Sequence, residues 1–527
     1  MQPDEFKGRK AMAATAALIL GVCALLISLH FLDDTDLLWH LKTGEIITHS
    51  GPPHKDIFSF VARGREWIDS QWLFQLIIYE VWRGFGFAGL SVMLSVIIAA
   101  TWLILFALAY RPRTGMLAFL LTLISLWGSQ LRFNVRPEIL SFLVIAIYLT
   151  VLEKDRQQRS QLIWTLVPLQ ALWSNIEGLW PIGPGLVGAY LLEAAAEKYF
   201  SKPSISPLAP GSGPVRLGAV LLCCVLASFG SPYFYNQYSF ALSLLSQVGS
   251  PSNPLHGYIG EFLPSFGPQY PLFFKVPLTI MIAFSILALA LNARKTRIAH
   301  VLVLGAFFAL ALKANRNAAL FCMAAAPFTA LNLNEFLVRR RPDPSQRHVL
   351  AMNGIFLALG ATLAGFFAFS IATQRFYVYD GTYHRFGAGF AFEKYPKDAC
   401  NFLKQTGWKG KIYDQTAMAD YLIWAGYPDW QVYVDTRLEV YGREQIMRAI
   451  KAESDYGILV DEDDKYQFEA ALIDYRINTG PYLAQKMLYD MRWVPVYQDS
   501  KILIFFKDIP SQKGLIEKYR LASVLNF

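Results

Sequence analysis

Long apolar stretches separated by short polar ones dominate the first 373 residues of the chain. A stretch of about 17–25 apolar residues is long enough to cross a bilayer as a helix. Eleven stretches approach that length and predict spans, namely 11–31, 88–110, 115–131, 137–153, 162–178, 181–197, 215–231, 271–292, 299–313, 318–336 and 349–373. The pattern therefore predicts an α-helical polytopic membrane protein whose transmembrane domain covers residues 1–373.

The C-terminal residues, 374–527, follow a different pattern, in which short strand-like and helix-like segments alternate. Strand-like segments lie at 411–414, 431–435, 471–478, 493–499 and 501–508, and helix-like segments lie at 397–407, 418–426, 443–453 and 483–491. Such alternation is typical of a small α/β domain with an open sheet. Asp499 and Ser500 alone separate the last two strands, which predicts a hairpin.

The loop between the first two predicted spans, residues 32–87, has helix signals of its own. Asp34 or Thr35 can cap a helix that ends near Ser50-Gly51-Pro52-Pro53. A second amphipathic segment, 67–86, is too short and too polar to span a bilayer. We expect both helices to lie at the outer membrane interface as part of the transmembrane domain. The apolar residues expected to face the membrane from the first helix are Leu38, Trp39, Leu41, Ile46 and Ile47.

Composition supports the membrane assignment. Hydrophobic residues make up 54% of the chain and charged residues only 17%, whereas soluble domains carry about 25% charged residues. The formal net charge is +8. In a polytopic membrane protein such an excess reflects cytoplasmic loops, and it does not indicate nucleic-acid binding.

Lys and Arg in the short loops predict the orientation, because cytoplasmic loops are enriched in them. The clusters all fall on the side of the N-terminus; they are Lys7, Arg9, Lys10, Arg111, Arg113, Lys154, Arg156, Arg159, Lys198, Lys202, Arg216, Arg294, Lys295, Arg297, Arg339, Arg340, Arg341 and Arg347. We therefore expect a multi-pass protein of the cell (inner) membrane with a cytoplasmic N-terminus. Eleven spans then place the C-terminal domain, 374–527, outside the cytoplasm.

Three carboxylates, Asp33, Asp34 and Asp36, directly follow the first span. Helix capping explains one or two of them. Crowded carboxylates raise one another's pKa unless a cation relieves them, and this suits a general base or a cation site. Both interpretations, capping and chemistry, remain open from the residues alone.

A divalent cation such as Mg²⁺ or Mn²⁺ is a further option at these carboxylates. Asp34, Asp36 and Asp56 offer the oxygen ligands that these ions prefer. His40 lies four residues after Asp36 on the same helical face. A single histidine in such a position is more often a hydrogen-bond partner than a ligand, so no cofactor is certain.

The first loop also carries a recognisable motif. The segment DTDLLWHLKTGEIITHSGPPHKDIFSF, 34–60, resembles a family of bacterial membrane proteins similar to the GT-C glycosyltransferases, with the pattern D-x-D-x-W-W-H-x-x-x-G followed by P-x-x-D-x-F-S. The matching residues are Asp34, Asp36, Trp39, His40, Gly44, Pro53, Asp56, Phe58 and Ser59, and Leu38 stands in place of a tryptophan. Looser matches are RPEILSF at Arg136, NRNAALF at Arg316, WSNIEG with Glu177 in place of a histidine, and VYVDTRLEVYG with Asp435, Arg437 and Tyr441.

The resemblance implies a GT-C-type enzyme that takes a sugar from a polyprenyl-phosphate donor at the extracytoplasmic face. Asp34 or Asp36 would be the general base. Basic residues at the outer ends of the spans are few, and Arg136, Arg316 and Arg132 are the candidates for the donor phosphate; the alternative for them is contact with lipid headgroups. His40, Asp56 and Glu177 would line the cavity. The acceptor, whether glycan, lipid or protein, stays open.

Other interpretations compete with this one. A transporter or flippase of a lipid-linked molecule requires charges in the middle of spans and two related halves, and the sequence shows little of either. A non-catalytic scaffold would account for the altered Glu177. Glu261 can line the cavity, although a surface position is more usual for such a residue. The run Asp461–Asp464 looks like a calcium ligand set, but a run of acids is usually a solvated loop.

Overall fold

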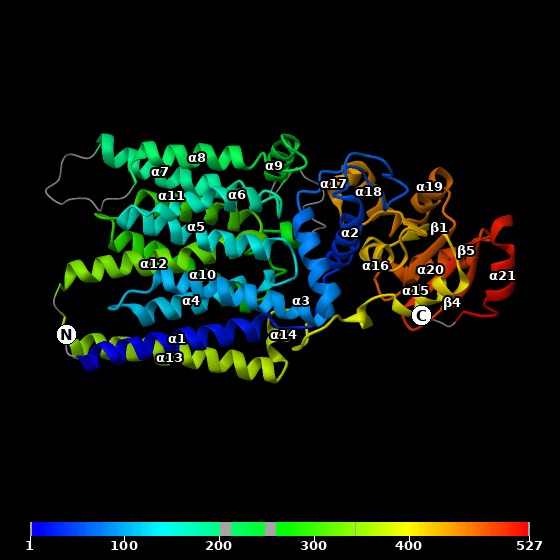
Figure 1. Cartoon of the computed structure of the whole chain (residues 1–527). Helices are drawn as coiled ribbons and strands as arrows, with labels where there is room; N and C mark the ends of the chain where they lie inside the picture. The colour runs from blue at the N-terminus through cyan, green and yellow to red at the C-terminus, as the bar shows by residue number, and fades with distance from the viewer. Residues whose placement is uncertain (1–2, 201–211, 248–259, 343, 525–527) are drawn as a thin grey trace. The chain divides into compact units, whose positions relative to one another are not determined.

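The computed structural model describes residues 3–200, 212–247, 260–342 and 344–524 (Figure 1). The chain divides into two compact units, and each unit contains segments that are far apart in the sequence. The first unit consists of Met1–Leu32 and Phe85–Gly389, and the second consists of Asp33–Gly84 and Phe390–Phe527.

All regular elements among the described residues of the first unit are helical. Its elements are α1 (Pro3–Ser28), most of α3 (Trp72–Ala109), α4 (Gly115–Ser129), η1 (Gln130–Arg132), α5 (Glu138–Gln158), η2 (Gln161–Thr165), α6 (Leu166–Trp173), α7 (Ile182–Phe200), α8 (Pro214–Ala227), α9 (Asn236–Gln247), η4 (Gly260–Phe262), α10 (Leu272–Leu291), α11 (Ile298–Lys313), η5 (Asn315–Asn317), α12 (Ala318–Arg340), α13 (Gln346–Ala372) and α14 (Arg375–Tyr379).

Six helices within the described ranges are long and apolar enough to cross a membrane. They are Lys10–Ser28, Trp72–Ala109, Gly115–Arg132, Leu272–Leu291, Asn315–Arg340 and Gln346–Ala372. The expected polytopic architecture is thus confirmed, although fewer helices reach a spanning length than the eleven apolar stretches predicted.

Helix α12 forms the centre of this unit and contacts α4, α10 and α11. Its residues from Ala318 to Ala330 are all buried, and six of these thirteen positions are alanine. Small side chains let neighbouring helix backbones approach closely, which is how helices pack inside a membrane. The sequence of α12 therefore explains its central position.

The stretch 162–178, expected to be one span, is a shorter element in the structure. It contains η2, then the eight-residue helix α6, which ends at Trp173. Ser174 Oγ and Asn175 Nδ2 donate hydrogen bonds to the carbonyl of Ala171 at 3.0 and 2.8 Å. These side chains satisfy a carbonyl that the next helical turn would otherwise use, so the helix stops before Glu177.

The second unit contains a five-stranded mixed sheet in the order β2-β1-β3-β5-β4. The strands are β1 (Gly410–Asp414), β2 (Trp430–Val432), β3 (Ala470–Asp474), β4 (Trp493–Gln498) and β5 (Ile502–Lys507). Strand β1 pairs in parallel with β2 and β3, whereas β5 runs antiparallel to both β3 and β4. All five expected strands and the β4–β5 hairpin are therefore confirmed. The two most buried strands, β3 and β5, are also the most apolar.

Helices of the second unit alternate with these strands, as the pattern predicted. They are α2 (Asp36–Ser50), the start of α3, η6 (Phe392–Lys394), α15 (Lys397–Thr406), α16 (Thr416–Gly426), α17 (Leu438–Tyr441), α18 (Arg443–Ala452), α19 (Tyr456–Tyr466), α20 (Gly480–Tyr489), η7 (Pro510–Gln512) and α21 (Lys513–Tyr519). Helix α19 was missed by the sequence pattern. The run Asp461–Asp464 lies in it, so the expected acidic loop is helical, and Glu462 and Asp463 are buried.

The first loop belongs to the second unit, which differs from the expected division of the chain at residue 373. Asp56 pairs with Arg437, and Ser59 Oγ donates to the carbonyl of Tyr433 at 2.9 Å. Ser59 also forms a β-bridge with Val432. Because these contacts are buried, Asp33–Gly84 completes the core of the C-terminal α/β domain instead of joining the helical unit.

Helix α2 also differs from the expected interfacial helix. Leu37, Leu38, Trp39 and Leu41 are buried inside the second unit, where α2 packs against α16. Its apolar face is therefore covered by protein rather than by lipid. The second expected helix is the start of α3, and the non-helical backbone of Gly86 (φ 63°, ψ −165°) separates it from the spanning part.

Candidate functional site

Three arginines of the first unit meet at one carboxylate. Arg132 ends η1, Arg136 lies between η1 and α5, and Arg316 lies in η5. Their Nη1 atoms lie 2.7, 3.2 and 3.3 Å, respectively, from the carboxylate oxygens of Glu261 in η4. These are the three arginines that we expected to bind phosphate. The fold brings them together, and we call Arg132, Arg136, Arg316 and Glu261 the arginine cluster.

Local contacts hold the cluster from two sides. The backbone N–H of Asn315 donates to the carbonyl of Leu263 at 2.9 Å, which ties η4 to η5. On the other side, Arg132 Nη2 donates to Glu138 Oε2 at 2.7 Å. Glu138 lies in the first turn of α5, where the helix dipole favours a carboxylate.

Exposure divides the cluster into a closed and an open part. The side chains of Arg132 and Glu138 are only 9% and 5% exposed. Those of Arg136 and Arg316 are 25% exposed, and that of Glu261 is 23% exposed. A ligand can therefore approach Arg136, Arg316 and Glu261 more easily than the buried pair of Arg132 and Glu138.

The electrostatics of the cluster favour an anion. Burial raises the pKa of Glu261, but Arg316, Arg132 and Arg136 together bring it well below its ordinary value. Glu261 is therefore ionised at neutral pH. With Glu138 included, three guanidinium groups face two carboxylates, so the formal charge is +1. Planar guanidinium donors with excess positive charge are well suited to phosphate oxygens.

Glu177 follows the turn that ends α6, and its side chain is buried. It accepts a hydrogen bond from the hydroxyl of Ser141, and Ser141 Oγ accepts one from Trp173 Nε1 at 2.7 Å. The charge of Glu177 interacts with those of Glu138, Arg316 and Arg132. The expected position of Glu177 in a cavity stays a prediction.

The two candidate bases, Asp34 and Asp36, lie at the start of α2 in the second unit. Asp34 Oδ1 accepts the backbone N–H of Asp36, the first residue of α2, at 3.1 Å, whereas the N-cap residue Thr35 makes no side-chain capping bond. Asp33 pairs with Lys394, and its carbonyl accepts the hydroxyl of Tyr395 at 2.6 Å. A local bond at the start of α2 thus accounts for one of the three carboxylates, and a lysine neutralises another.

Asp36 is part of an acidic group that the sequence pattern did not indicate. Asp420 of α16 is fully buried, and its carboxylate accepts the hydroxyl of Thr436 at 2.9 Å. Burial raises the pKa of Asp420 well above its ordinary value, and the charges of Asp36 and Asp435 raise it further. Glu439 also interacts with Asp36. The available signal was a single acid, Asp420, inside the otherwise apolar segment 418–426.

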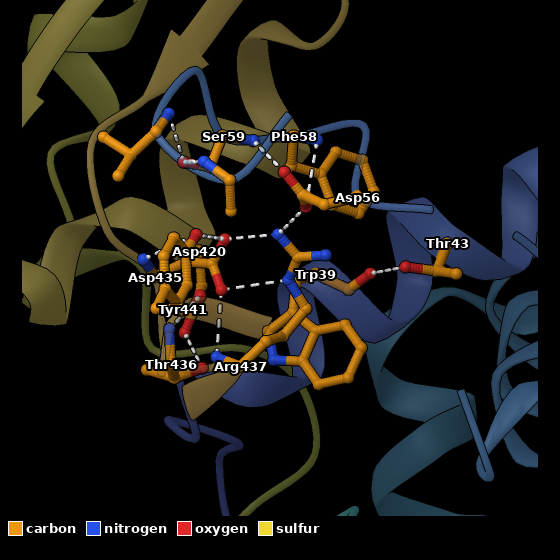
Figure 2. A network of polar contacts seen from close by, with 12 residues as sticks. Trp39, Thr43, Asp56, Phe58, Ser59, Asp420, Asp435, Thr436, Arg437 and Tyr441 are labelled. Carbon is orange, nitrogen blue, oxygen red and sulfur yellow. Dashed lines mark hydrogen bonds and ion pairs between the residues drawn. The ribbon is translucent and has the colours of Figure 1, made fainter. Parts of the chain in front are cut away.

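Figure 2 shows the buried network around Arg437 in the same unit. Arg437 Nη2 lies 2.7 Å from Asp56 Oδ1 and 2.6 Å from Asp435 Oδ2, and all three side chains are 0% exposed. The Tyr441 hydroxyl donates to Asp435 Oδ2 at 2.6 Å. The Arg437 guanidinium also lies 4.5 Å from the ring centre of Trp67. Asp56, expected to line a cavity, is instead an ion-pair partner that holds the first loop to the C-terminal segment.

The structure does not assemble the predicted metal ligands. The carboxylate of Asp56 is bound to Arg437. His40 is buried, its Nδ1 lies 3.3 Å from Gln75 Nε2, and its ring contacts Trp39. Within the described part of the chain, no group of three or more His, Cys, Asp or Glu side chains has a geometry that would hold a metal ion. The predicted set of Asp34, Asp36 and Asp56 therefore does not fit Mg²⁺ or Mn²⁺ here.

Comparison with known proteins was informative only at the level of structure. No protein-family model matches the sequence, and no curated protein matches it. Among solved structures, the oligosaccharyltransferase AglB from Archaeoglobus fulgidus, in complex with an inhibitory peptide and a dolichol-phosphate, superimposes with a TM-score of 0.57. That match covers 97% of this chain and 75% of AglB at 12% identity.

Two further structures have the same architecture. ArnT from Cupriavidus metallidurans, bound to undecaprenyl phosphate, matches with a TM-score of 0.50 at 13% identity over 94% of this chain and 98% of ArnT. The arabinofuranosyltransferase AftD from Mycobacteria matches with a TM-score of 0.52 at 14% identity, over 96% of this chain and 40% of AftD. The chain has the GT-C fold. Identities this low establish the fold, which the motif at 34–60 predicted, and leave the activity to be argued from the residues.

Proposed function

We propose that this GT-C protein is a membrane glycosyltransferase that moves a sugar from a polyprenyl-phosphate-linked donor to an acceptor at the extracytoplasmic face. The observation that carries the proposal is the arginine cluster. Three arginines from two separate segments, 130–136 and 315–317, meet at one partly exposed carboxylate. Such a group of fixed donors can bind the donor phosphate and stabilise the charge that develops on it.

The proposed reaction assigns one role to each group. The acceptor oxygen or nitrogen attacks the anomeric carbon of the sugar, and the bond from that carbon to the phosphate oxygen breaks. Its electron pair stays on the leaving polyprenyl phosphate, which Arg136, Arg316 and Arg132 stabilise. Asp34 or Asp36 takes the proton of the acceptor, a contribution of about 10²–10⁴-fold. No step is assigned to a metal ion, because the residues present do not form the predicted ligand set.

The orientation is part of the proposal and follows from the distribution of Lys and Arg, which favours a cytoplasmic N-terminus. The second unit, with Asp34 and Asp36, is then extracytoplasmic. The proposal covers a glycan, a lipid or a protein as the acceptor.

The test is a transfer assay with the purified full-length protein in lipid nanodiscs. A panel of polyprenyl-phosphate sugars labelled in the sugar is supplied, and the release of polyprenyl phosphate and labelled product is measured by mass spectrometry. We expect release with at least one donor. Asp34→Asn or Asp36→Asn should reduce it by about 100-fold or more if that residue is the base.

The choice of asparagine separates catalysis from capping. In the variant Asp34→Asn the side chain keeps the oxygen that accepts the backbone N–H of Asp36, so the helix start is preserved while the base is lost. Glu45→Gln on the same helix, whose partner is Lys42 at 2.7 Å, serves as the matched control and should leave transfer unchanged. Full activity of both aspartate variants would exclude the assigned base, and an absence of transfer by the wild type with every donor would contradict the proposed function.

A further inference from the structure

The arginine cluster contains an anion already, and the two glutamates that supply negative charge there differ in how firmly they are held. Glu138 lies on the 21-residue helix α5 and is 5% exposed. Glu261 lies on η4, a three-residue 3₁₀ helix without a buried residue, and is 23% exposed. Moving Glu261 therefore disturbs little packing, whereas moving Glu138 would remove the more deeply buried of the two carboxylate partners of Arg132.

The contacts of Glu261 occupy the face that a phosphate would need. Arg132, Arg136 and Arg316 all direct Nη1 to its two oxygens, at 2.7, 3.2 and 3.3 Å. The two longer distances involve the two more exposed arginines. A phosphate and the Glu261 carboxylate cannot both accept from the same N–H groups, so they compete for the site.

We propose that the Glu261 carboxylate occupies the phosphate site when no donor is bound. It then holds the three guanidinium groups in place, and the phosphate of the incoming lipid displaces it. The inference rests on the proposed function only for the identity of the ligand, a phosphate ester on a polyprenyl chain. Competition of a carboxylate with a phosphate at these arginines does not depend on sugar transfer.

Charge and acceptor count both make the exchange reasonable. A phosphodiester donor carries one negative charge, so its exchange for Glu261 leaves the formal charge of the site at +1. After transfer the leaving phosphate monoester carries up to two charges, and the site becomes neutral. A phosphate also offers more acceptor oxygens than a carboxylate. Arg132 Nε, which is buried and has no hydrogen-bond partner among the described residues, is a donor that an additional acceptor could use.

The same competition predicts a role in product release. The product phosphate binds more strongly than the donor because of its second charge. A tethered carboxylate that returns to the arginines lowers the apparent affinity of the product by the fraction of time it occupies the site. Glu261 is thus a positioning residue, which acts through the arginines and not on the reacting atoms.

The test measures equilibrium binding of radiolabelled undecaprenyl phosphate to the full-length protein in zwitterionic nanodiscs. Glu261→Gln should bind it about tenfold more tightly than the wild type, since an occupied site lowers apparent affinity in proportion. The affinity for undecaprenol, which lacks the phosphate, should not increase in this variant. Inorganic phosphate is a separate arm that tells a lipid-borne phosphate from a free one: a gain for the lipid alone shows a lipid site, and a gain for both shows a general anion site.

Glu335→Gln is the matched control, because Glu335 is another glutamate of the first unit beside an arginine, Arg297, at 3.7 Å. It should leave binding unchanged. Equal or weaker binding of undecaprenyl phosphate by Glu261→Gln would overturn the inference, since Glu261 would then support the site instead of competing for it. Tighter binding together with no sugar transfer by the wild type would retain the inference and contradict the proposed function.

A second measurement needs no substitution and covers the case that the variant does not fold. In hydrogen–deuterium exchange of the wild-type protein, peptides spanning Gly260–Tyr270 should exchange faster when undecaprenyl phosphate is added, because η4 loses the ion pairs of Glu261. Slower or unchanged exchange there would mean that Glu261 stays in place when the lipid binds, which contradicts displacement.

Discussion

Buried carboxylates in the second unit differ in how many of their oxygens accept a hydrogen bond or an ion pair, and this affects what each contributes to stability. Asp56 faces Arg437 inside a closed network. Asp69 accepts from the backbone N–H of Gln71 at 3.2 Å and from Gln75 Nε2 at 3.0 Å through Oδ1 only, and its Oδ2 has no hydrogen-bond partner in the described part of the chain. A buried oxygen without a partner penalises the charged form of the carboxyl group.

Asp69 therefore makes the stability of the second unit depend on pH. Burial raises the pKa of Asp69 to about 7 from 3.8. Between these values the folded state holds a proton that the unfolded state has lost, so stability falls as pH rises through this window and is level above it. Each pKa unit corresponds to about 1.4 kcal/mol, and the total is a few kcal/mol at most.

The variant Asp69→Asn should remove this dependence, because an asparagine keeps Oδ1 as acceptor and has no charge to bury. Thermal unfolding of the detergent-solubilised protein between pH 5 and 8 should show a smaller decline for the variant than for the wild type. Asp429→Asn, at a residue 50% exposed and paired with Lys409, is the control and should retain the wild-type slope. Equal slopes for Asp69→Asn and wild type would exclude Asp69 as the source.

At the scale of elements, local sequence patterns predicted the helices and strands that neighbouring residues determine. They missed the features that contacts with distant residues determine. The continuous apolar run within 501–508 and the two-residue turn at Asp499 were enough to predict β4 and β5. Nothing near Trp39 shows that α16 covers it, so α2 was expected at a lipid surface. Likewise, Glu462 is buried because Tyr433 and Gln445 donate hydrogen bonds to it, and a run of acids alone does not reveal such partners.

The arginine cluster also shows that contacts between distant residues cannot be predicted from local sequence patterns. Arg132, Arg136 and Arg316 were selected because few basic residues lie at the outer ends of the spans, and the fold did unite them. Glu261 was expected at the surface, because no partner lies near it in the sequence. Arg132 and Arg136 are 129 and 125 residues away, and two helices separate Arg316 from it. Residue type and position along the spans thus predict which class of ligand a site binds. That Glu261 occupies the same arginines can be seen only from interatomic distances in the structure.

Gly86 gives a prediction at this scale, since it breaks α3 where the chain passes from one unit to the other. Its backbone (φ 63°, ψ −165°) lies in a region that is essentially restricted to glycine. Gly86→Ala should therefore lower stability by about 1–3 kcal/mol, seen as a lower melting temperature in detergent.

Gly84→Ala is the matched control for this substitution. Gly84 is helical, and a Cβ there meets no atom within 4 Å. Alanine is favoured over glycine in helices by about 1 kcal/mol, so Gly84→Ala should be neutral or stabilising. A melting temperature of Gly86→Ala at or above that of Gly84→Ala would show that the break does not need a glycine.

For the whole molecule, the decisive feature is that the α/β unit is assembled from two segments separated by most of the helical unit. Arg437 lies in the second segment, but Asp56, Phe58 and Trp67, which surround it, lie in the first. Breaking a buried ion pair by removing one partner costs about 3–5 kcal/mol. That is a large share of the roughly 5–15 kcal/mol that stabilises a domain, so the C-terminal segment should not fold without the first loop.

Expression of separate fragments tests this assembly. Residues 390–527 alone should be insoluble or lack a cooperative thermal transition. Residues 33–84 joined to them by a Gly/Ser linker of about 15 residues, flexible enough to let the segments meet, should be soluble and unfold cooperatively. Asp56→Asn in the fused protein should lower its melting temperature, because Arg437 loses a charged partner in a fully buried place. If residues 390–527 alone melted cooperatively at the same temperature as the fused protein, the C-terminal segment would be a complete domain without the first loop. The ion pair with Arg437 would then not be what positions the acidic residues of the first loop.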